Sequence, residues 1–290
     1  MFRKFEAVME LCRFDRPLLA IPFAGTAAYL FSGDGIPDFR RLALLFIALF
    51  AAFGAGGAMN GLTDLRIDKV NPRTIGRPLA AGRLSKREAA AVGVVGIATM
   101  VAATYALDPR LLLLLPIPAG LALFYSLTKR FTWGCHFFLA TVNAGCPVGA
   151  WLVFNGFDPH DIRGVLLGAV VFFWTVGFEL IYSSQDAQYD VAMGMNSIPA
   201  RFGIRRAYQI SKVCHATMTV LLAALLFIVR PGMPFYVALA CAYAVLLHEH
   251  AMVAHDNVAR AGETFDWNEV FSCLVFLGAA ADKWRFIKWG

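Results

Sequence analysis

Amide and carboxylate side chains recur at every fourth residue where a long apolar segment ends. They are Asn60, Asp64 and Asp68, and they follow the apolar residues 42–59. Four-residue spacing places successive side chains on one side of an α-helix. Oxygen ligands at this density are those that a hard divalent cation such as Mg²⁺ prefers. The pattern therefore predicts a metal site at the end of a membrane helix, and a solvated loop with scattered charge is the alternative.

Guanidinium groups come directly behind these acids. Arg73, Arg77 and Arg83 lie in the polar segment that follows. The planar guanidinium presents hydrogen-bond donors in a fork that matches phosphate oxygens. An Asp at membrane depth costs roughly 2.5–3.5 kcal/mol on insertion scales, which disfavours chance placement. Acids and arginines together are typical of a site for a phosphorylated substrate.

A second acidic segment repeats the pattern later in the chain. Asp186 and Asp190 each lie 122 residues after the two aspartates of the first motif, and they also follow an apolar segment. A loop containing Pro, Gly and Arg comes after both motifs. Repetition at a fixed interval predicts two pseudo-repeat halves, about 17–130 and 131–290, that face one shared site.

Composition indicates a membrane protein. Hydrophobic residues make up 59% of the 290 residues, and charged residues make up only 16%. A soluble domain usually carries about 25% charged residues. Only helices and closed barrels satisfy the backbone in lipid, and the alternating pattern of a barrel is absent from the sequence. We therefore predict an all-α fold, a single polytopic membrane helical bundle around a central cavity.

Apolar windows long enough to cross roughly 30 Å of hydrocarbon recur along the chain. About nine transmembrane helices are predicted, at residues 17–33, 42–60, 88–107, 110–127, 133–154, 163–183, 206–229, 233–252 and 268–285. The ninth is the weakest, because Asp282 and Lys283 interrupt it. Most of the 26 Lys and Arg residues fall on the side of the N-terminus, which predicts a cytoplasmic N-terminus with both acidic motifs facing the cytoplasm.

The net charge of +6 bears on partners as well as on orientation. The basic residues lie mainly in loops between predicted spans, so they indicate membrane-orienting charge and no nucleic-acid partner. The six cysteines show no CxxC pairing, which favours buried thiols over a disulfide framework or a zinc site.

Further polar residues fall on the same predicted face. The segment YSLTKR, residues 125–130, ends the fourth predicted span. Lys129 could direct a compact charge at a phosphate, and an interfacial snorkelling residue is the alternative. Glu179 and Tyr182 precede Asp186 at helical spacing, so they could line the same cavity. Protonated packing of Glu179 in the core is equally open.

Together these residues resemble the UbiA superfamily of intramembrane prenyltransferases. Residues 60–68 look like the family's N-x-x-x-D-x-x-x-D motif, residues 186–190 look like its D-x-x-x-D motif, and YSLTKRFT resembles its basic loop. The stretches YSSQDAQYD and CPVGAW look most like the 4-hydroxybenzoate polyprenyltransferases and their menaquinone-pathway relatives. Two positions depart from the pattern: Gly61 stands where many members carry another Asp, and Gly194 stands where a third carboxylate would lie.

The resemblance implies transfer of a polyprenyl group, with Mg²⁺, from an allylic polyprenyl diphosphate to an aromatic acceptor similar to 4-hydroxybenzoate, in quinone biosynthesis. It implies an enzyme among the lipids of a bacterial cytoplasmic membrane. The implied metal ligands are Asn60, Asp64, Asp68, Asp186 and Asp190, and the implied catalytic residues are the four aspartates with Lys129. The side chains implied to bind the diphosphate donor are Arg73, Arg77, Arg130, Arg201, Tyr125 and Tyr182.

Other functions remain open on the sequence alone. A naphthoate, haem, chlorophyll or lipid-type acceptor is compatible with the same motifs. A lipid phosphotransferase would concentrate its acids in one motif, whereas this chain divides them between two. A cation-coupled transporter would place carboxylates near the bilayer midplane on interrupted helices. These acids lie at the ends of predicted helices beside basic loops, which favours an enzyme.

Overall fold

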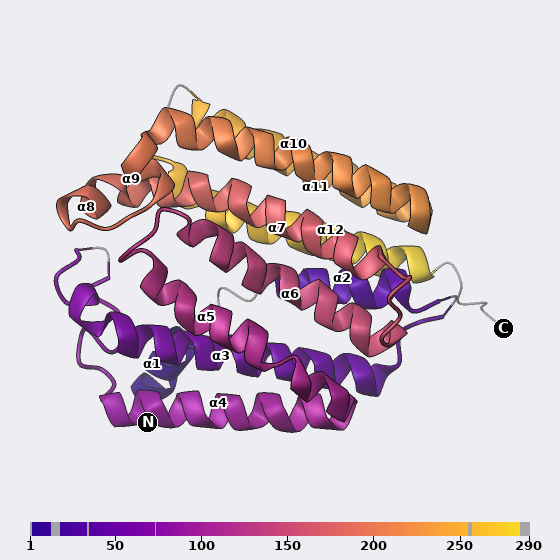
Figure 1. Ribbon diagram of the computed structural model, residues 1–290, viewed down its shortest axis with the longest axis horizontal. Helices are drawn as coiled ribbons and strands as arrows, with labels where there is room; N and C mark the ends of the chain where they lie inside the picture. The colour runs from indigo at the N-terminus through magenta and orange to yellow at the C-terminus, as the bar shows by residue number, and fades with distance from the viewer. Residues whose placement is uncertain (1, 13–17, 34, 73, 255–256, 285–290) are drawn as a thin grey trace. The chain divides into compact units, whose positions relative to one another are not determined.

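The computed structural model describes the chain except for residues 1, 13–17, 34, 73, 255–256 and 285–290. Every regular element in this described part is a helix, which confirms the all-helical class (Figure 1). The chain divides into two compact units. Unit 1 comprises Met1–Pro17 and Phe39–Ser126, and unit 2 comprises Leu18–Asp38 and Leu127–Gly290.

Six helical segments of the described residues are long and apolar enough to cross a membrane. They are Phe39–Asp68 (α3), Lys86–Leu107 (α4), Cys135–Asn155 (α6), Arg163–Ala192 (α7 with its continuation), Ile204–Val229 (α10) and Met233–Met252 (α11). The other three predicted spans coincide with the short helices α2 (Ile21–Phe31) and α5 (Pro116–Thr128) and with α12 (Thr264–Trp284), which carries charged residues near both ends. The chain is an integral membrane protein.

Proline residues explain why the fourth predicted span is shorter than its apolar window. Pro109 opens the 3-10 helix η1 (Pro109–Leu113), and Pro116 is the first residue of α5. A proline has no backbone N–H, and its ring clashes with the carbonyl four residues earlier, so it is tolerated where a helix begins but not inside one. The apolar run is therefore divided between η1 and the 13-residue helix α5.

In unit 1, α3 and α4 pack side by side, and the N-terminal helix α1 (Phe2–Leu11) contacts both. The start of α4 is fixed by a capping box. The backbone N–H of Glu88 donates to Ser85 Oγ at 3.2 Å, and the backbone N–H of Ser85 donates to the Glu88 carboxylate at 2.8 Å. These bonds satisfy N–H groups that a helix start leaves without partners. The cap therefore sets where the loop after α3 ends.

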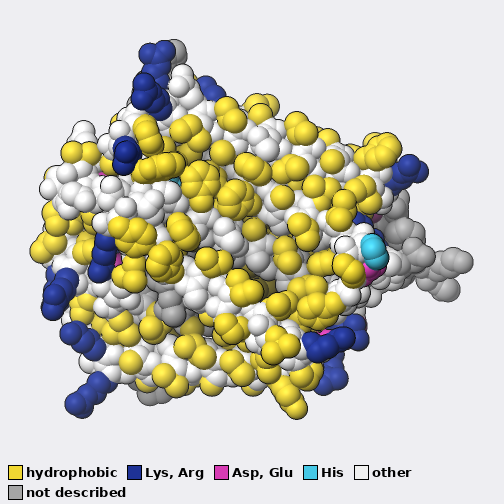
Figure 2. Space-filling view, viewed as in Figure 1, with side chains coloured by type: hydrophobic (Ala, Val, Ile, Leu, Met, Phe, Trp, Pro, Cys, Tyr) yellow, Lys and Arg dark blue, Asp and Glu magenta, His cyan; other side chains and the backbone are white. Residues whose placement is uncertain are grey.

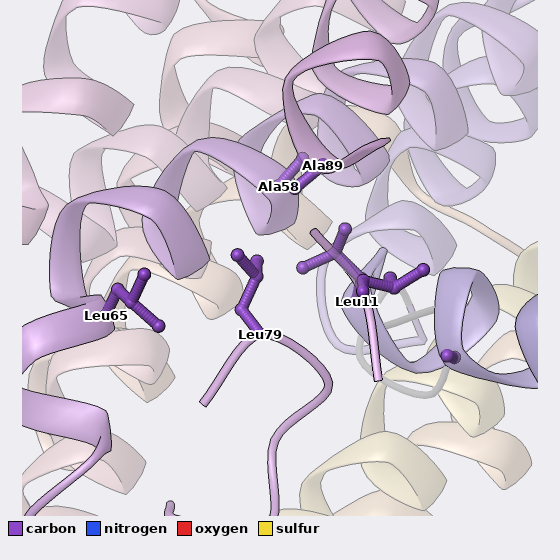
Figure 3. Close-up of a cluster of buried hydrophobic side chains, with 7 residues drawn as sticks. Leu11, Ala58, Leu65, Leu79 and Ala89 are labelled. Carbon is purple, nitrogen blue, oxygen red and sulfur yellow. The ribbon is translucent and has the colours of Figure 1, made fainter. Parts of the chain in front are cut away.

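A small apolar cluster ties this loop to the helices, and we call it the unit 1 core. Figure 3 shows that Leu79 of the loop lies among side chains of α3 and α1. The buried members of the cluster are Ala7, Leu11, Ala58, Leu65, Leu79, Leu84 and Ala89. Because the loop contributes two leucines, it is packed against the helices and does not extend freely into solvent.

The end of α1 lies against α3 at Gly57, and a substitution there tests this contact. A Cβ at Gly57 would lie 2.5 Å from the carbonyl oxygen of Leu11, whereas a Cβ at Gly56 would meet no atom within 4 Å. We expect Gly57→Ala to destabilise the protein by about 1–3 kcal/mol, because the clash is with backbone. We expect Gly56→Ala to stabilise it by about 0.5–1 kcal/mol through helix propensity. Unfolding in detergent checks the opposite signs, and equal shifts for the two variants would contradict the contact.

In unit 2, α7 (Arg163–Tyr182) is the central helix. It contacts α6, α10, α2 and α12, and α11 packs against α12. Trp174 of α7 is fully buried, and its ring lies 4.9 Å from that of Phe23 and 5.7 Å from that of Phe271. Aromatic pairs at these separations add to the stability that burial provides. A rigid, aromatic core therefore holds the helix that carries the second acidic motif.

The outer surfaces of both units suit a hydrocarbon environment. In Figure 2, the side chains visible along the helices are mostly hydrophobic, and Lys and Arg side chains gather at helix ends. Exposed apolar residues include Val94 on α4, at 66%, and Val220 on α10, at 69%. Valine side chains exposed to this extent on a long apolar helix are stable against lipid tails and unfavourable against water.

Candidate functional site

The first acidic motif lies wholly on a helix. The sequence predicted that the helix would end near residue 60, but α3 continues to Asp68, eight residues further. Asn60, Asp64 and Asp68 therefore occupy successive turns of α3, which confirms the geometry that four-residue spacing indicated. Asp68 is only 4% exposed, whereas Asn60 and Asp64 are half-buried.

Asp68 is paired with an arginine from the loop that follows. Arg77 Nη1 donates to both carboxylate oxygens of Asp68, at 2.9 and 3.0 Å. The carboxylate is nearly enclosed, so it requires a partner, because an uncompensated buried charge costs several kcal/mol on an order-of-magnitude scale. The pair offsets the burial of the carboxylate and holds the guanidinium at the end of α3.

The loop that carries Arg77 is compact. Its backbone turns back on itself through bonds from Arg77 N to Thr74 O at 3.0 Å and from Ala81 N to Arg77 O at 2.8 Å. Arg83 closes it, because Nη2 donates to Gly76 O at 2.7 Å and to Glu10 of α1 at 2.8 Å. Packing and hydrogen bonds together therefore fix the position from which Arg77 reaches Asp68.

The second acidic motif begins where α7 gives way to a 3-10 helix. After Tyr182 the helix continues as a 3-10 turn, η2 (Ser183–Asp186), and then as α8 (Ala187–Ala192). The Ser184 hydroxyl lies 2.9 Å from the hydroxyl of Tyr208 on α10. A 3-10 segment within a helix rotates the side chains that follow it, and such segments often mark functional sites. Asp186 stands at the end of this turn, half-buried, and Asp190 lies one turn beyond.

Lys129 is paired with Asp190. Lys129 Nζ lies 3.3 Å from Asp190 Oδ2, and Asp190 is 1% exposed. Burial alone would lower the pKa of the Lys129 ammonium, but the carboxylates of Asp190 and Asp186 nearby outweigh it and hold that pKa above its ordinary value. Lys129 therefore carries its positive charge at neutral pH, directly against the second acidic motif.

Asn196 holds Lys129 in place, and sequence reasoning did not single it out. The chain turns back after α8, where Gly194 has a φ of +64° and Met195 N donates to Asp190 O at 2.7 Å. Asn196 N then donates to Lys129 O at 2.7 Å. A left-handed turn of this kind favours glycine. Gly194 stands where the motif would carry a third carboxylate. It thus allows the chain to turn back, so that Asn196 can bind the backbone of Lys129.

The remaining predicted residues are more dispersed. Arg130 and Arg201 are exposed, and the Arg201 guanidinium lies 5.7 Å from the centre of the Phe202 ring. Tyr125 is half-buried on α5, and the Tyr182 ring lies 5.4 Å from that of Phe265. Arg73 lies outside the described residues. The structure therefore brings together Asp68 with Arg77 and Asp190 with Lys129, each within one unit.

The chemistry of the donor set fits Mg²⁺. Each unit offers carboxylate oxygens at the end of a membrane helix, and unit 1 adds the amide of Asn60. No group of three or more His, Cys, Asp or Glu side chains converges as a metal site among the residues that the structure describes. Hard oxygen donors without thiols or imidazoles suit Mg²⁺, which also keeps waters and substrate phosphates as ligands. The types of donor that each unit offers are therefore compatible with Mg²⁺.

Comparison with known proteins gives a family match. The model of the UbiA prenyltransferase family matches residues 20–275. The 4-hydroxybenzoate octaprenyltransferase of Yersinia pseudotuberculosis is 26% identical, with 97% of each chain covered. Among solved structures, the apo form of a UbiA homolog from Aeropyrum pernix K1 is similar at a TM-score of 0.83 and 30% identity, with 93% of this chain and 98% of that chain covered.

A more distant structure shares the fold. It is a UbiA homolog from Archaeoglobus fulgidus bound to GPP and Mg²⁺. It is similar at a TM-score of 0.71 and 16% identity, with 95% of this chain and 99% of that chain covered.

Proposed function

Because this chain belongs to the UbiA prenyltransferase family, we propose that it transfers a polyprenyl group from an allylic polyprenyl diphosphate to an aromatic acceptor similar to 4-hydroxybenzoate. The full-length similarity to a 4-hydroxybenzoate octaprenyltransferase supports this acceptor class. One structural observation carries the proposal. In each unit, an apolar span ends in a buried aspartate that is paired with a cation from a polar loop.

The two acidic motifs form one site in the proposed enzyme. Asp64 and Asp68 of unit 1 and Asp186 and Asp190 of unit 2 supply its carboxylates, and Asn60 adds an amide oxygen. The equal spacing of the two motifs supports a shared site. Bound Mg²⁺ would neutralise the diphosphate and stabilise it as a leaving group.

The basic residues act on the diphosphate directly. Arg77 and Lys129 are held against the carboxylates at 2.9 and 3.3 Å, which supports a role for both in binding the diphosphate. Preorganised positive charge stabilises the leaving group as its negative charge develops. In this proposal, Arg73, Arg130 and Arg201 add positive charge for the diphosphate, and Tyr125 and Tyr182 contribute to donor binding.

The prenyl chain and the acceptor meet away from water. Ionisation of the C–O bond produces an allylic cation, which water would capture if it had access. The apolar helices provide the dry environment, and the electron-rich acceptor ring attacks the cation to form the new C–C bond. The isoprenoid tail can lie against apolar side chains, which gives this chemistry a reason to take place within a membrane.

We place this site at the cytoplasmic face of a bacterial cytoplasmic membrane. The excess of Lys and Arg on the side of the two motifs supports that orientation. Both substrates would then enter from the side where soluble aromatic acids and polyprenyl diphosphates are made. A naphthoate or another acceptor is the alternative within the family, and a transporter is the alternative outside it.

An acceptor panel tests the function. Purified protein is mixed with Mg²⁺ and a labelled polyprenyl diphosphate, together with 4-hydroxybenzoate, a dihydroxynaphthoate or no acceptor. We expect diphosphate release with formation of a prenylated hydroxybenzoate. A product formed only from the naphthoate would move the chain to that acceptor class. The lack of diphosphate release with every acceptor would contradict prenyl transfer.

Lys129 provides a test of the proposed charge on the donor. We expect Lys129→Ala to weaken donor binding or slow ionisation by about 10- to 100-fold, the effect of losing one hydrogen bond to a charged group. Lys129→Arg should restore only part of the activity, because a planar fork does not replace a compact ammonium. The Mg²⁺ requirement should persist in both variants.

The matched control is Arg206→Ala, which removes an exposed positive charge of the same unit. Its donor KM should stay at the wild-type value. Wild-type kinetics in Lys129→Ala would show instead that the lysine is only an interfacial anchor.

A further inference from the structure

Unit 2 contains a buried acid and a buried histidine that the proposed diphosphate site does not use. Glu179 of α7 is 9% exposed and His136 of α6 is 2% exposed. His136 Nδ1 lies 3.9 Å from Glu179 Oε2, which is ion-pair distance but longer than a hydrogen bond. His136 Nε2 has no hydrogen-bond partner among the described residues. Buried ionisable groups are costly in a membrane protein, so such a pair indicates function.

The pair lies close to the second acidic motif. Glu179 precedes Tyr182 by three residues, so these two side chains share one face of α7, and Asp186 follows seven residues after Glu179 at the end of the 3-10 turn η2. At 1.5 Å per residue, Glu179 lies roughly 10 Å deeper along the helix than Asp186. On the other side, Cys135 beside His136 contacts the carbonyl of Asn196, which in turn binds Lys129. The pair therefore lies beneath the half-site that Lys129 and Asp190 form.

Prenylation of an aromatic ring requires a proton acceptor at such a place. The C–O bond of the donor breaks, and its electron pair leaves with the diphosphate. The ring then forms a C–C bond to the allylic carbon and retains a hydrogen on the attacked carbon. Aromaticity returns only when that proton leaves and the electron pair of the C–H bond goes back to the ring. The departing diphosphate is bound to cations, so it is a poor base.

We propose that the Glu179 carboxylate is the catalytic base that takes the ring proton, and that His136 is a positioning residue that holds this carboxylate. The inference rests on the proposed function. The 3.9 Å separation leaves the carboxylate lone pairs available to the ring hydrogen. The imidazole close by orients the carboxylate before the step. After the step the proton resides on Glu179.

The test separates ionisation from proton loss. Wild-type enzyme and Glu179→Gln are assayed with Mg²⁺, a labelled polyprenyl diphosphate and 4-hydroxybenzoate that is either unlabelled or deuterated on the ring. We expect diphosphate release to remain near the wild-type rate in Glu179→Gln, while prenylated product falls about 10-fold or more. The missing product should appear as prenyl alcohol, because water captures the cation. Ring deuteration should slow product formation in Glu179→Gln and not in wild type.

Companion variants keep the result interpretable. Glu179→Asp retains a carboxylate and should restore part of the product without restoring the wild-type rate. His136→Gln should lower product formation less than Glu179→Gln and should also introduce an isotope effect. Glu249→Gln is the matched control, because Glu249 is a carboxylate of the same unit that is 1% exposed and lies on α11. Its diphosphate release and product yield should both match wild type.

Three outcomes would overturn the inference. The first is that Glu179→Gln loses diphosphate release and product formation equally. The second is that Glu179→Gln forms product at the wild-type rate, and the third is that it loses product without an isotope effect. Each would assign the pair to packing or to substrate binding. A wild-type enzyme that prenylates no aromatic acceptor would instead refute the proposed function, so the two failures are distinguishable.

Discussion

Asp64→Asn and Asp186→Asn should each lower the rate of prenyl transfer by about 100-fold or more, because each removes one charged ligand from the diphosphate site. Asn preserves size and hydrogen bonding but lacks the charge and half of the ligand capacity of a carboxylate. The double variant should lose far less than the product of the two single effects. Residues that act as one unit fail together once any of them is removed.

The comparison is made across a Mg²⁺ titration, together with thermal unfolding in detergent. Stability should change little, because neighbouring carboxylates repel one another in the absence of metal and losing one charge relieves that repulsion. Asp266→Asn, at an exposed position on α12, is the control and should retain full activity. If the two single effects multiply while stability is unchanged, the motifs do not share a site.

Removing divalent metal should abolish prenyl transfer, with a loss of about 1,000-fold or more in rate. If the four carboxylates share one site as proposed, they would repel the diphosphate in the absence of metal, and Arg77 and Lys129 alone would not neutralise both. The fold itself should survive, because Asp68 is held by Arg77 and Asp190 by Lys129. Excess Mg²⁺ added after the chelator should therefore restore activity without refolding.

A binding measurement complements the rate. Mg²⁺ alone should raise the unfolding temperature slightly, and Mg²⁺ with a non-hydrolysable donor analogue should raise it by much more, because ligands that bind only the folded state stabilise it by mass action. The donor analogue without metal should give almost no shift. Full activity in the presence of chelator would contradict the metal mechanism.

The sequence predicted the positions of the helices better than their ends. The apolar run indicated that a helix would stop near residue 60, but α3 continues to Asp68. Hydropathy records where apolar side chains stop, whereas hydrogen bonding and the packing of Leu65 in the unit 1 core decide where a helix stops. The four-residue spacing of the motif was the better guide, because it reflects the helix directly.

The residues that pair with the buried acids could not be predicted from the sequence. Arg77 was one of several candidate arginines, and its selection depends on a loop whose turns and packing are set by α1. The contact between His136 and Glu179 depends on how α6 packs against α7, 43 residues apart along the chain. Four-residue spacing describes one helix, and it contains no information on which neighbour will face it.

The two ion pairs differ in when they can form during synthesis. Arg77 follows Asp68 by nine residues, so this pair can close as soon as α3 and its loop have left the ribosome. Lys129 precedes Asp190 by 61 residues, and the pair must wait until α6 and α7 have been inserted. Closing a longer loop costs more entropy, although the cost rises only slowly with length. Asp68 is therefore neutralised by a neighbour while the chain is still short. Lys129, in contrast, is without its partner Asp190 during the early stages of membrane insertion.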